Sequence, residues 1–374
     1  MNPFAVFSPD YISARQRFRD AAAALGWTLE AHPIGAAGPD GEELTIDVGY
    51  SSAGDPQKTL VVSSGMHGIE GFFGSAVQAA VLEHWASTTR PSTRCVFLHA
   101  LNPFGFSWLR RCDESNVDPN RNFLLPGEPF EGTAPAYARF DPFLNPRCPP
   151  SPWEPFTLKA MVLIALYGMP MLRQAVAAGQ YGYPLGLFFG GTKPSRMQEL
   201  LNEILPRLLQ GSQSVVHFDF HTGLGNHGDC KLLIDYPLNA LQHRWLTDWF
   251  GADSFEASHS SGIAYDARGG FGRWCVSRGL SADYLFACAE FGTYGPVPVL
   301  AGLRAENQAH HWGKRTSSAT IRAKDRLKEL FCPTSEAWRK RVIEQSLDLV
   351  SRAHPGPSRT LRHLGKIGDL RSAA

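Results

Sequence analysis

Three short segments of the sequence combine metal-binding side chains with glycines. They span residues 65–71, 219–225 and 288–293. Two imidazoles and one carboxylate form a common zinc-binding set, which leaves one coordination position for water and therefore suits a catalytic metal. His67 and Glu70 lie three positions apart among glycines, so a tight loop can direct both side chains toward one ion. With His221 from the second segment, the pattern predicts a catalytic metal centre.

The sequence also allows other interpretations of these histidines. A lone His-x-x-Glu pair is a weak signal, because most such histidines are capping or surface-loop residues. His217 and Asp219 alternate with His221 along a predicted strand and lie on the same face of it. His217 is therefore a second candidate for the third metal ligand.

Glu290 in the third segment could supply a catalytic base. It follows an apolar stretch and precedes Gly292, as expected of a carboxylate at the end of a strand. From such a partly buried position it could activate water as a general base. The alternative is an exposed glutamate with no catalytic role. Cys288 nearby is more typical of core packing than of a nucleophile.

The elements that must position these side chains are predicted from hydrophobic periodicity. Residues 59–64 form a buried strand that ends at a glycine, and residues 71–85 have the apolar spacing of a helix, so the first segment is a strand-to-helix loop. Residues 214–220 and 280–287 are strands that lead into the other two segments. Ligands of open α/β sheets bind beyond the carboxyl ends of strands. We therefore expect all three segments to meet at one edge of a sheet.

The rest of the chain alternates helices with strands. The further predicted elements are a helix at 8–26, strands at 27–34, 44–50 and 94–101, and helices near 157–177 and 195–210. Turn residues at 38–41 predict that the first two of these strands form an antiparallel pair. The order predicts an α/β fold, a three-layer α/β/α sandwich with a mixed, mostly parallel central sheet. We expect a single domain over residues 1–374 with an insertion around 124–213.

Composition limits the expected partners and the cellular setting. Lys and Arg number 36 against 35 Asp and Glu, a net charge of +1, so no bulk field attracts nucleic acid or an anionic membrane. The seven cysteines are odd in number and form no Cys-x-x-Cys pair, which argues against a disulfide framework and for a reduced, cytoplasmic setting. The N-terminus lacks the pattern of a secretory signal. The most apolar run, 161–172, is shorter than the ~20 residues that span a bilayer, and predicts a buried helix.

A further stretch connects these residues to a known family. Residues 116–123 read Asn-Val-Asp-Pro-Asn-Arg-Asn-Phe and follow two arginines. With the His-x-x-Glu pair, an Asn-Pro-Phe-Gly turn at 102–105, a distant histidine and a late glutamate, this order resembles the zinc carboxypeptidase family and its aspartoacylase and succinylglutamate desuccinylase-like relatives. The resemblance covers residues 58–123, 214–225 and 286–293. It implies a zinc carboxypeptidase-like (phosphorylase/hydrolase-like) fold and a Zn²⁺ cofactor. By the same resemblance, the zinc ligands are His67, Glu70 and His221, and the general base is Glu290.

The resemblance also implies roles for residues near 116–123. Asn120 and Arg121 correspond to the clamp on the carboxylate of the substrate, for which a planar guanidinium is well suited. A structural ion pair is the alternative for Arg121. Asp118 corresponds to the carboxylate that orients the first histidine ligand. Arg111 corresponds to the arginine that polarises the carbonyl group, with its neighbour Arg110 as the alternative.

Two amide substrates fit this resemblance. One is a small peptide that loses its C-terminal residue, and the other is an N-acyl amino acid that is deacylated. Asp-Phe-His-Thr at 219–222 is similar to the deacylases, whereas Asn122 and Phe123 are similar to the peptidases. A third alternative is a zinc-binding relative without turnover, because Pro119 and the insertion depart from the family pattern. The sequence does not indicate an oligomeric state, and the histidines at 310–311 are expected at the surface.

Overall fold

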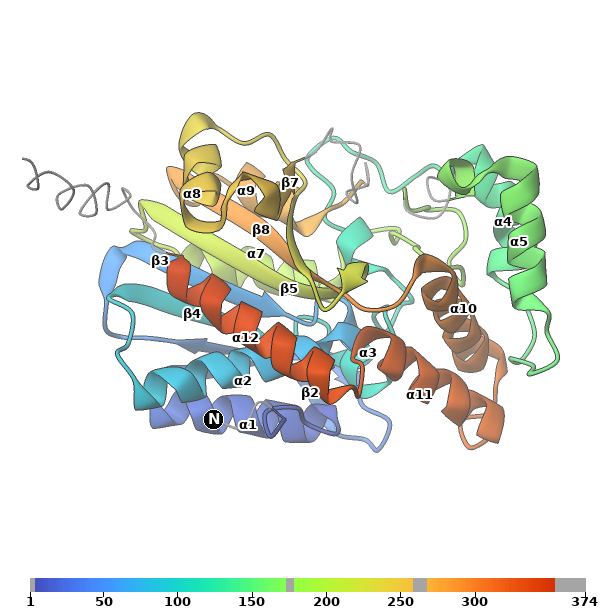
Figure 1. Ribbon diagram of the computed structural model, residues 1–374, viewed down its shortest axis with the longest axis horizontal. Coiled ribbons are helices and arrows are strands. Elements are labelled where there is room, and N and C mark those ends of the chain that lie inside the picture. Colours follow the sequence, from blue (N-terminus) through green and yellow to red (C-terminus); the bar gives the residue numbers. More distant parts are fainter. Residues whose placement is uncertain (1–3, 173–177, 258–267, 354–374) are drawn as a thin grey trace, which may run out of the picture.

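The computed structural model describes residues 4–172, 178–257 and 268–353. Its centre is an eight-stranded sheet with the strand order β1-β2-β4-β3-β5-β8-β6-β7 (Figure 1). The strands are β1 (Thr28–Ala37), β2 (Glu43–Tyr50), β3 (Asp55–Ser64), β4 (Thr93–His99), β5 (Ser214–His227), β6 (Cys230–Ile234), β7 (Phe255–Ala257) and β8 (Asp283–Gly292). Strands β4, β3, β5 and β8 run parallel to one another. Their outer neighbours β2 and β6 are antiparallel, so the predicted mixed, mostly parallel sheet is confirmed.

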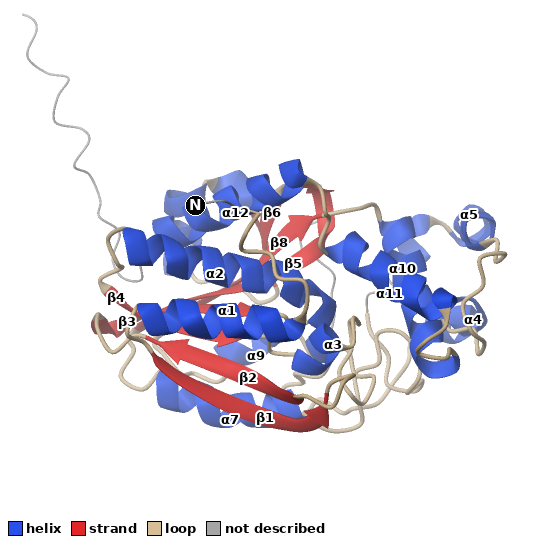
Figure 2. Ribbon diagram, turned by 90° about the horizontal axis from the view of Figure 1, so that it is seen from below, coloured by secondary structure: helices blue, strands red, loops and turns tan. Residues whose placement is uncertain are grey.

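Helices cover both faces of the sheet. One face carries α1 (Tyr11–Ala24), α2 (Gly71–Ser87) and α12 (Glu336–Arg352), and the other carries α7 (Arg196–Leu208) and α9 (Phe271–Ser277) (Figure 2). The other helices of the described residues are α3 (Pro103–Ser107), α4 (Pro135–Leu144), α5 (Phe156–Tyr167), α8 (Ala240–Phe250), α10 (Pro296–Trp312) and α11 (Ser318–Phe331). Short 3₁₀ turns are η1 (Gly68–Glu70), η2 (Pro119–Arg121) and η3 (Ala252–Ser254). Helices α10, α11, α4 and α5 lie beyond the carboxyl ends of the middle strands (Figure 1).

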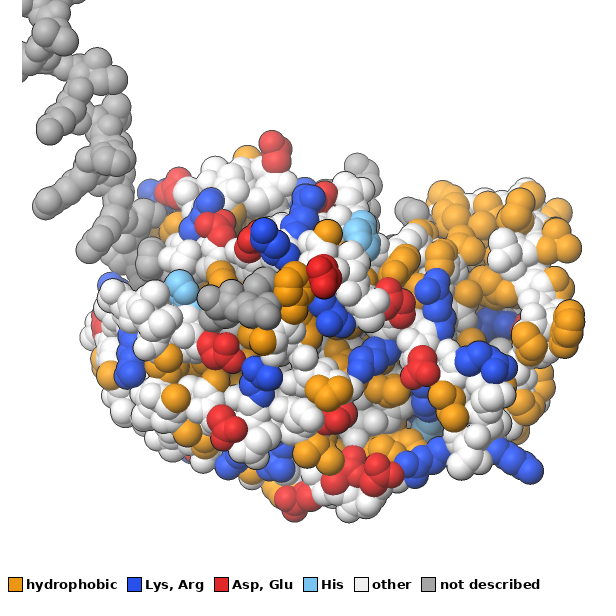
Figure 3. Space-filling view, turned by 60° about the horizontal axis from the view of Figure 1, so that its bottom comes forward, with side chains coloured by type: hydrophobic (Ala, Val, Ile, Leu, Met, Phe, Trp, Pro, Cys, Tyr) orange, Lys and Arg blue, Asp and Glu red, His pale blue; other side chains and the backbone are white. Residues whose placement is uncertain are grey.

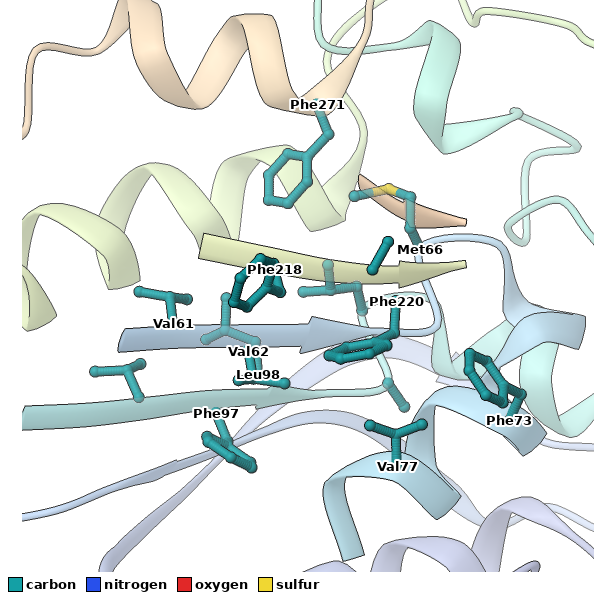
Figure 4. Packing of buried hydrophobic residues seen from close by; sticks show 14 of the residues in the cluster. Val61, Val62, Met66, Phe73, Val77, Phe97, Leu98, Phe218, Phe220 and Phe271 are labelled. Carbon is teal, nitrogen blue, oxygen red and sulfur yellow. The ribbon is translucent and has the colours of Figure 1, made fainter. Parts of the chain in front are cut away.

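The core lies where α2 packs between the sheet and the outer helices. Helix α2 is buried on nearly all sides, because α1 and α12 cover the faces that the sheet leaves free. Its Phe73 stacks edge-on against Phe220 of β5, with ring centroids 6.3 Å apart (Figure 4). The middle strands read as continuous apolar runs because both of their faces are covered. This packing fixes the strand ends from which the candidate site is built.

The structure bears out most of the predicted elements. Strands β1 and β2 pair in antiparallel fashion around the expected turn, and Asp10 caps α1 by accepting the N–H of Ser13 at 2.8 Å. Helix α7 departs from its expected place in an insertion, because Leu201 and Leu205 are fully buried in the main core. The inserted helices are therefore α4 and α5. Strands β6 and β7 were not predicted, since both are short.

The prediction of a buried helix at 161–172 is wrong. Helix α5 covers the first part of this run and buries only Ala160, while Met161 and Leu166 are 61% and 67% exposed. Hydrophobic side chains gather on the surface at this end of the molecule (Figure 3). The physical reason is that α5 projects from the body of the molecule instead of lying between layers (Figure 1). Residues 173–177, at the end of the predicted helix, lie outside the described part of the chain.

Two expectations from composition can be compared with the structure. All seven cysteines are free thiols, as their spacing predicts. Within the described residues, no helix has both the length and the apolar character needed to cross a membrane.

Candidate metal centre and its cavity

The loop between β3 and α2 carries the first two predicted ligands. Gly65 has a φ of +68°, a conformation that suits glycine, where the chain leaves the strand. Gly68 lies against helix α3, and a Cβ atom there would come within 2.1 Å of the Gly105 carbonyl carbon. The N–H of Ile69 donates to the Arg110 carbonyl at 2.9 Å. The glycines therefore let the loop rest on the segment that carries the two predicted arginines.

The Nδ1 atoms of His67 and His221 face the same carboxylate. His67 Nδ1 lies 2.8 Å from one oxygen of Glu70, and His221 Nδ1 lies 3.0 Å from the other. One potential ligand atom from each of the three residues lies within 4.8 Å of the others. The two rings are nearly perpendicular, at 78°. Two imidazole nitrogens and a carboxylate in this arrangement fit a zinc ion.

The other ring nitrogen of each histidine faces a second carboxylate. His67 Nε2 lies 3.3 Å from Asp118 and 2.6 Å from a terminal nitrogen of Arg111, and His221 Nε2 lies 2.6 Å from Asp219. Outer carboxylates of this kind fix the tautomer and the ring orientation of metal-binding histidines. Asp118 therefore lies beside His67, and its orienting role stays a prediction. Asp219 was not assigned this role, although its place two residues before His221 on the same strand face was a usable signal.

His217, the alternative third ligand, belongs to a different hydrogen-bond network. Its Nε2 lies 2.8 Å from the Ser63 hydroxyl, and its Nδ1 lies 2.9 Å from the Tyr284 hydroxyl. The Ser63 hydroxyl also donates to Asp219 at 2.7 Å. Burial lowers the pKa of His217 to about 4, so its ring is neutral. The structure therefore places His217 behind Asp219, away from the candidate ligand atoms.

Charges within the cluster oppose the effect of burial. Burial by itself would raise the pKa of Glu70, but His67 and His221 outweigh it and lower that pKa. Burial would lower the pKa of His221, yet Asp219 and Glu70 raise it well above its ordinary value. The space between Glu70 and the two imidazoles therefore attracts positive charge, which a metal ion can provide.

Arg110 and Arg111 point in different directions. Arg111 Nε donates to Asp118 at 2.8 Å, one of its terminal nitrogens lies 3.7 Å from Glu70, and its side chain lines a cavity at the site. Arg110 is buried, does not line this cavity, and has its Nε 3.4 Å from Glu306. The predicted substrate contact of Arg110 is therefore corrected, because its side chain is held by α10. Arg111 is the arginine that faces the candidate ligands.

Strand register brings Glu290 next to the second histidine. Strands β5 and β8 are parallel, with His221 opposite Glu290. The Leu224 N–H donates to the Glu290 carboxylate at 2.7 Å. Burial and the neighbouring Glu70 raise the pKa of Glu290 to about 7. A carboxylate with a pKa near neutrality can both accept and return a proton, as a general base must.

Asn120 and Arg121 line the same cavity from the η2 turn. The Asp118 carboxylate caps this turn by accepting the Asn120 N–H. The side-chain oxygen of Asn120 accepts the Phe271 N–H at 2.9 Å, so its amide NH₂ group is left as a donor. Arg121 donates to the Asn120 carbonyl at 2.7 Å. Together these side chains offer the donors that a carboxylate accepts.

The cavity that joins these residues has a volume of about 580 Å³, within the range of sites for small molecules. Its polar lining includes the predicted site residues His67, Glu70, Arg111, Asn120, Arg121, His221 and Glu290. Its remaining walls are largely apolar and include residues of α4, α5 and α10. These wall residues were missed in the sequence, because nothing in a run of Leu, Ile and Phe distinguishes a cavity wall from a core.

Comparisons with known proteins agree with this architecture. A family model described as "Protein of unknown function (DUF2817)" matches residues 7–345. No curated protein matches the sequence. Bovine thrombin-activatable fibrinolysis inhibitor, solved in complex with tick carboxypeptidase inhibitor, shares 12% identity over 92% of this chain and 95% of its own, with a TM-score of 0.50.

Two further solved structures are similar at lower scores. Murein-tripeptide amidase MpaA from Escherichia coli O157 shares 17% identity over 82% of this chain and 93% of its own, with a TM-score of 0.37. An aspartoacylase family protein from Mesorhizobium loti shares 14% identity over 78% of this chain and 68% of its own, with a TM-score of 0.38. The similarity to the bovine protein shows the fold, and it confirms the predicted zinc carboxypeptidase-like α/β class.

Proposed function

The chain belongs to the family described as "Protein of unknown function (DUF2817)", and we propose that it is a metal-dependent hydrolase that cleaves an amide bond next to a free carboxylate. One observation carries the proposal. The Nδ1 atoms of His67 and His221 converge on Glu70 at the edge of a cavity, and strand register sets Glu290 beside them. Three ligands and an adjacent carboxylate form the minimal set for metal-assisted hydrolysis.

The residues of the cavity have complementary roles in this reaction. A zinc ion held by His67, Glu70 and His221 would supply a Lewis acid that polarises the amide carbonyl and acidifies water. Glu290 accepts the proton of the attacking water. The guanidinium of Arg111 stabilises the negative charge that develops on the carbonyl oxygen.

The bond changes balance with water as the only co-reactant. The oxygen of water forms a new bond to the carbonyl carbon, and Glu290 takes one proton from it. As the carbon–nitrogen bond breaks, Glu290 returns this proton to the leaving nitrogen. The products are a carboxylic acid and an amine, and Glu290 is again a carboxylate.

The polar residues of η2 orient the substrate. The Asn120 amide and the Arg121 guanidinium line the cavity together with the candidate ligands. A free carboxylate bound there would hold the neighbouring amide bond at a fixed distance from Glu290, which favours reaction through proximity. The C-terminal bond of a small peptide and the amide bond of an N-acyl amino acid both meet this requirement.

The decisive experiment combines a substrate panel with one substitution. Zinc-loaded protein is incubated with small peptides and N-acyl amino acids, and products are identified by mass spectrometry. We expect Glu290→Gln to lower kcat/KM by about 10³-fold, since general bases contribute roughly 10²- to 10⁴-fold, while the zinc content stays unchanged. The matched control is Glu344→Gln, because Glu344 is 62% exposed on α12 and far from any cavity residue in sequence.

Three outcomes would contradict the proposal. Hydrolysis of no panel member by zinc-loaded protein would favour a binding protein without turnover. Full activity in Glu290→Gln would show that Glu290 is not the general base. Retention of zinc after substitution of both His67 and His221 by alanine would show that the metal binds elsewhere.

A further inference from the structure

One wall of the cavity is entirely apolar. Every residue that α4, α5 and the turns up to Leu172 contribute to the lining is apolar, namely Phe140, Phe143, Leu144, Phe156, Ala160, Leu163, Ile164, Met169 and Leu172. The lining residues of α10 are also apolar, namely Pro296, Val297, Val299, Leu300 and Leu303. Helices lie on this side beyond the strand ends that carry the candidate metal ligands (Figure 1).

The residues that α5 presents to the cavity form a regular stripe. They are Phe156, Ala160, Leu163 and Ile164, with the spacing i, i+4, i+7 and i+8. This spacing is the stripe that an amphipathic helix normally turns toward a protein core. Here the stripe lines a cavity that also contains Glu290 and the candidate ligands. An apolar group that enters the cavity would cover the stripe and gain the free energy of apolar burial.

The wall is anchored to the body of the molecule. Arg304 of α10 is buried and donates to the Phe143 carbonyl oxygen and to Glu154, which precedes α5. Its guanidinium also lies 5.5 Å from the ring centroids of Phe143 and Phe156. Arg304 therefore holds α4 and α5 against α10 at a defined separation. A wall fixed in this way can select a ligand by its shape.

A peptide would be a poor occupant of this part of the cavity. Each peptide unit brings an N–H and a C=O that need partners when they are buried. The wall offers only apolar side chains, and apart from the terminal turns the backbone groups of α5 and α10 are hydrogen-bonded within the helices. An aliphatic chain has no such groups to satisfy, so burying it in this part of the cavity has no comparable cost.

We infer that the substrate is an N-acyl amino acid whose acyl group is an aliphatic chain of medium or greater length. This inference rests on the proposed amide hydrolysis. The carboxylate of the amino acid lies at Asn120 and Arg121, and the amide bond lies at Glu290. The acyl chain of the substrate extends between α4, α5 and α10. The products are then a fatty acid and a free amino acid. Between the two substrates that the sequence allows, the wall favours the deacylase.

The length of the acyl chain of the substrate is the variable that tests the inference. N-acetyl, N-butanoyl, N-hexanoyl, N-octanoyl and N-decanoyl derivatives of one amino acid are compared at concentrations below micelle formation. Each buried methylene contributes ~0.8 kcal/mol, so kcat/KM should rise about fourfold per methylene until the wall is covered. Binding of the same series to zinc-loaded Glu290→Gln, measured by calorimetry, should strengthen with the same slope.

Two pairs of substitutions on α5 separate the wall from the rest of the helix. Ala160→Phe narrows the cavity and should lower the decanoyl-to-butanoyl ratio of kcat/KM by at least about fifteenfold, the value of two buried methylenes. Val162→Phe is its control, because Val162 is 49% exposed on the outer face. Leu163→Gln is a second cavity variant, and Leu166→Gln on the outer face is its control.

The results that would overturn the inference differ from those that overturn the proposed function. If neither kcat/KM nor the binding affinity changes with the length of the acyl chain, the cavity has no acyl-binding site, although the proposed amide hydrolysis still holds. The same holds if only peptides are cleaved, or if Ala160→Phe and Leu163→Gln behave like their controls. Absence of hydrolysis with every peptide and N-acyl substrate would instead contradict the proposed function, and the calorimetric series would still decide for or against the acyl site.

Discussion

Arg110 and Arg111 are neighbours in the sequence, yet they belong to two different buried clusters of charge. We call the first the closed cluster, which comprises Arg110, Glu306, Lys324 and His310. We call the second the metal cluster, which comprises His67, Glu70, Arg111, Asp118, Asp219 and His221. Both clusters contain an arginine, a buried glutamate and at least one histidine. Only the metal cluster opens into the large cavity.

The two clusters differ in charge balance. In the closed cluster, Arg110 Nε and Lys324 Nζ lie 3.4 and 2.9 Å from the same Glu306 oxygen. Burial would raise the pKa of Glu306, but these two cations outweigh it and lower the pKa. The carboxylate therefore has its counter-charges within the protein.

The metal cluster carries an excess of carboxylates over fixed cations. Glu70, Asp118 and Asp219 surround two imidazoles, and Arg111 is the guanidinium that pairs with Asp118. Buried charge without a counter-charge is costly. The comparison teaches that residue types alone do not identify a metal site. What distinguishes it is an uncompensated negative charge that faces an opening large enough for a ligand.

The largest expected effect comes from breaking the closed cluster. Glu306→Ala leaves Arg110 and Lys324 buried without their shared partner, and removing one member of a buried ion pair costs about 3–5 kcal/mol. We expect a loss of this size in the free energy of unfolding measured by urea denaturation. The matched control, Glu344→Ala, removes an exposed partner of Lys340 and should cost less than about 1 kcal/mol. Equal effects from the two substitutions would show that the closed cluster is not a stabilising unit.

The next effect separates the two adjacent arginines. Arg111→Met should lower kcat/KM by about 10²- to 10³-fold, or roughly 3–4 kcal/mol, because a donor to the developing oxyanion is lost. Arg110→Met should lower the free energy of unfolding but keep kcat/KM, per zinc-loaded folded molecule, within about tenfold. Both values come from steady-state kinetics with the best substrate of the panel. The same loss of activity in both variants would remove the distinction between the clusters.

The smallest expected effect is the acid sensitivity of the closed cluster. The histidines at 310–311 are half-buried rather than at the surface, and burial and Arg110 lower the pKa of His310 to about 3. Lys324 and His311 oppose its protonation too, and Glu306 alone favours it. An unfolded chain has a histidine pKa of about 6.5. As the pH falls from about 6.5 toward 3, the unfolded state therefore binds a proton that the folded state does not.

The free energy of unfolding should consequently be highest above pH 6.5 and fall below it. We expect His310 to contribute about 2 kcal/mol of this loss near pH 5. Urea denaturation from pH 7 to pH 4.5 should give a shallower decline for His310→Gln than for the unsubstituted protein. His84→Gln, which changes an exposed histidine of α2, should leave the decline as it is. An identical decline for His310→Gln would show that the acid sensitivity has another source.

Much of the candidate site could be predicted because its parts are local in the sequence. The spacing from His67 to Glu70 and the run from Asp118 to Arg121 each lie within one turn or loop, and the strands before them show clear apolar periodicity. The register that sets Glu290 opposite His221 joins residues far apart along the chain, and periodicity holds no information on such pairing. Asp219, the partner of His221, was missed for a different reason, because alternation along a strand predicts which face a side chain occupies but not whether it touches the next side chain on that face.

The sequence by itself determined which side chains stand at strand ends, because local hydrophobic spacing and glycine positions are properties of neighbouring residues. Only the tertiary structure decided that Arg111 faces the ligands and Arg110 faces Glu306, and that the apolar helix α5 borders a cavity instead of a core. These outcomes depend on which distant elements pack together. That packing is decided by how much apolar surface the whole chain buries and by which buried charges it pairs.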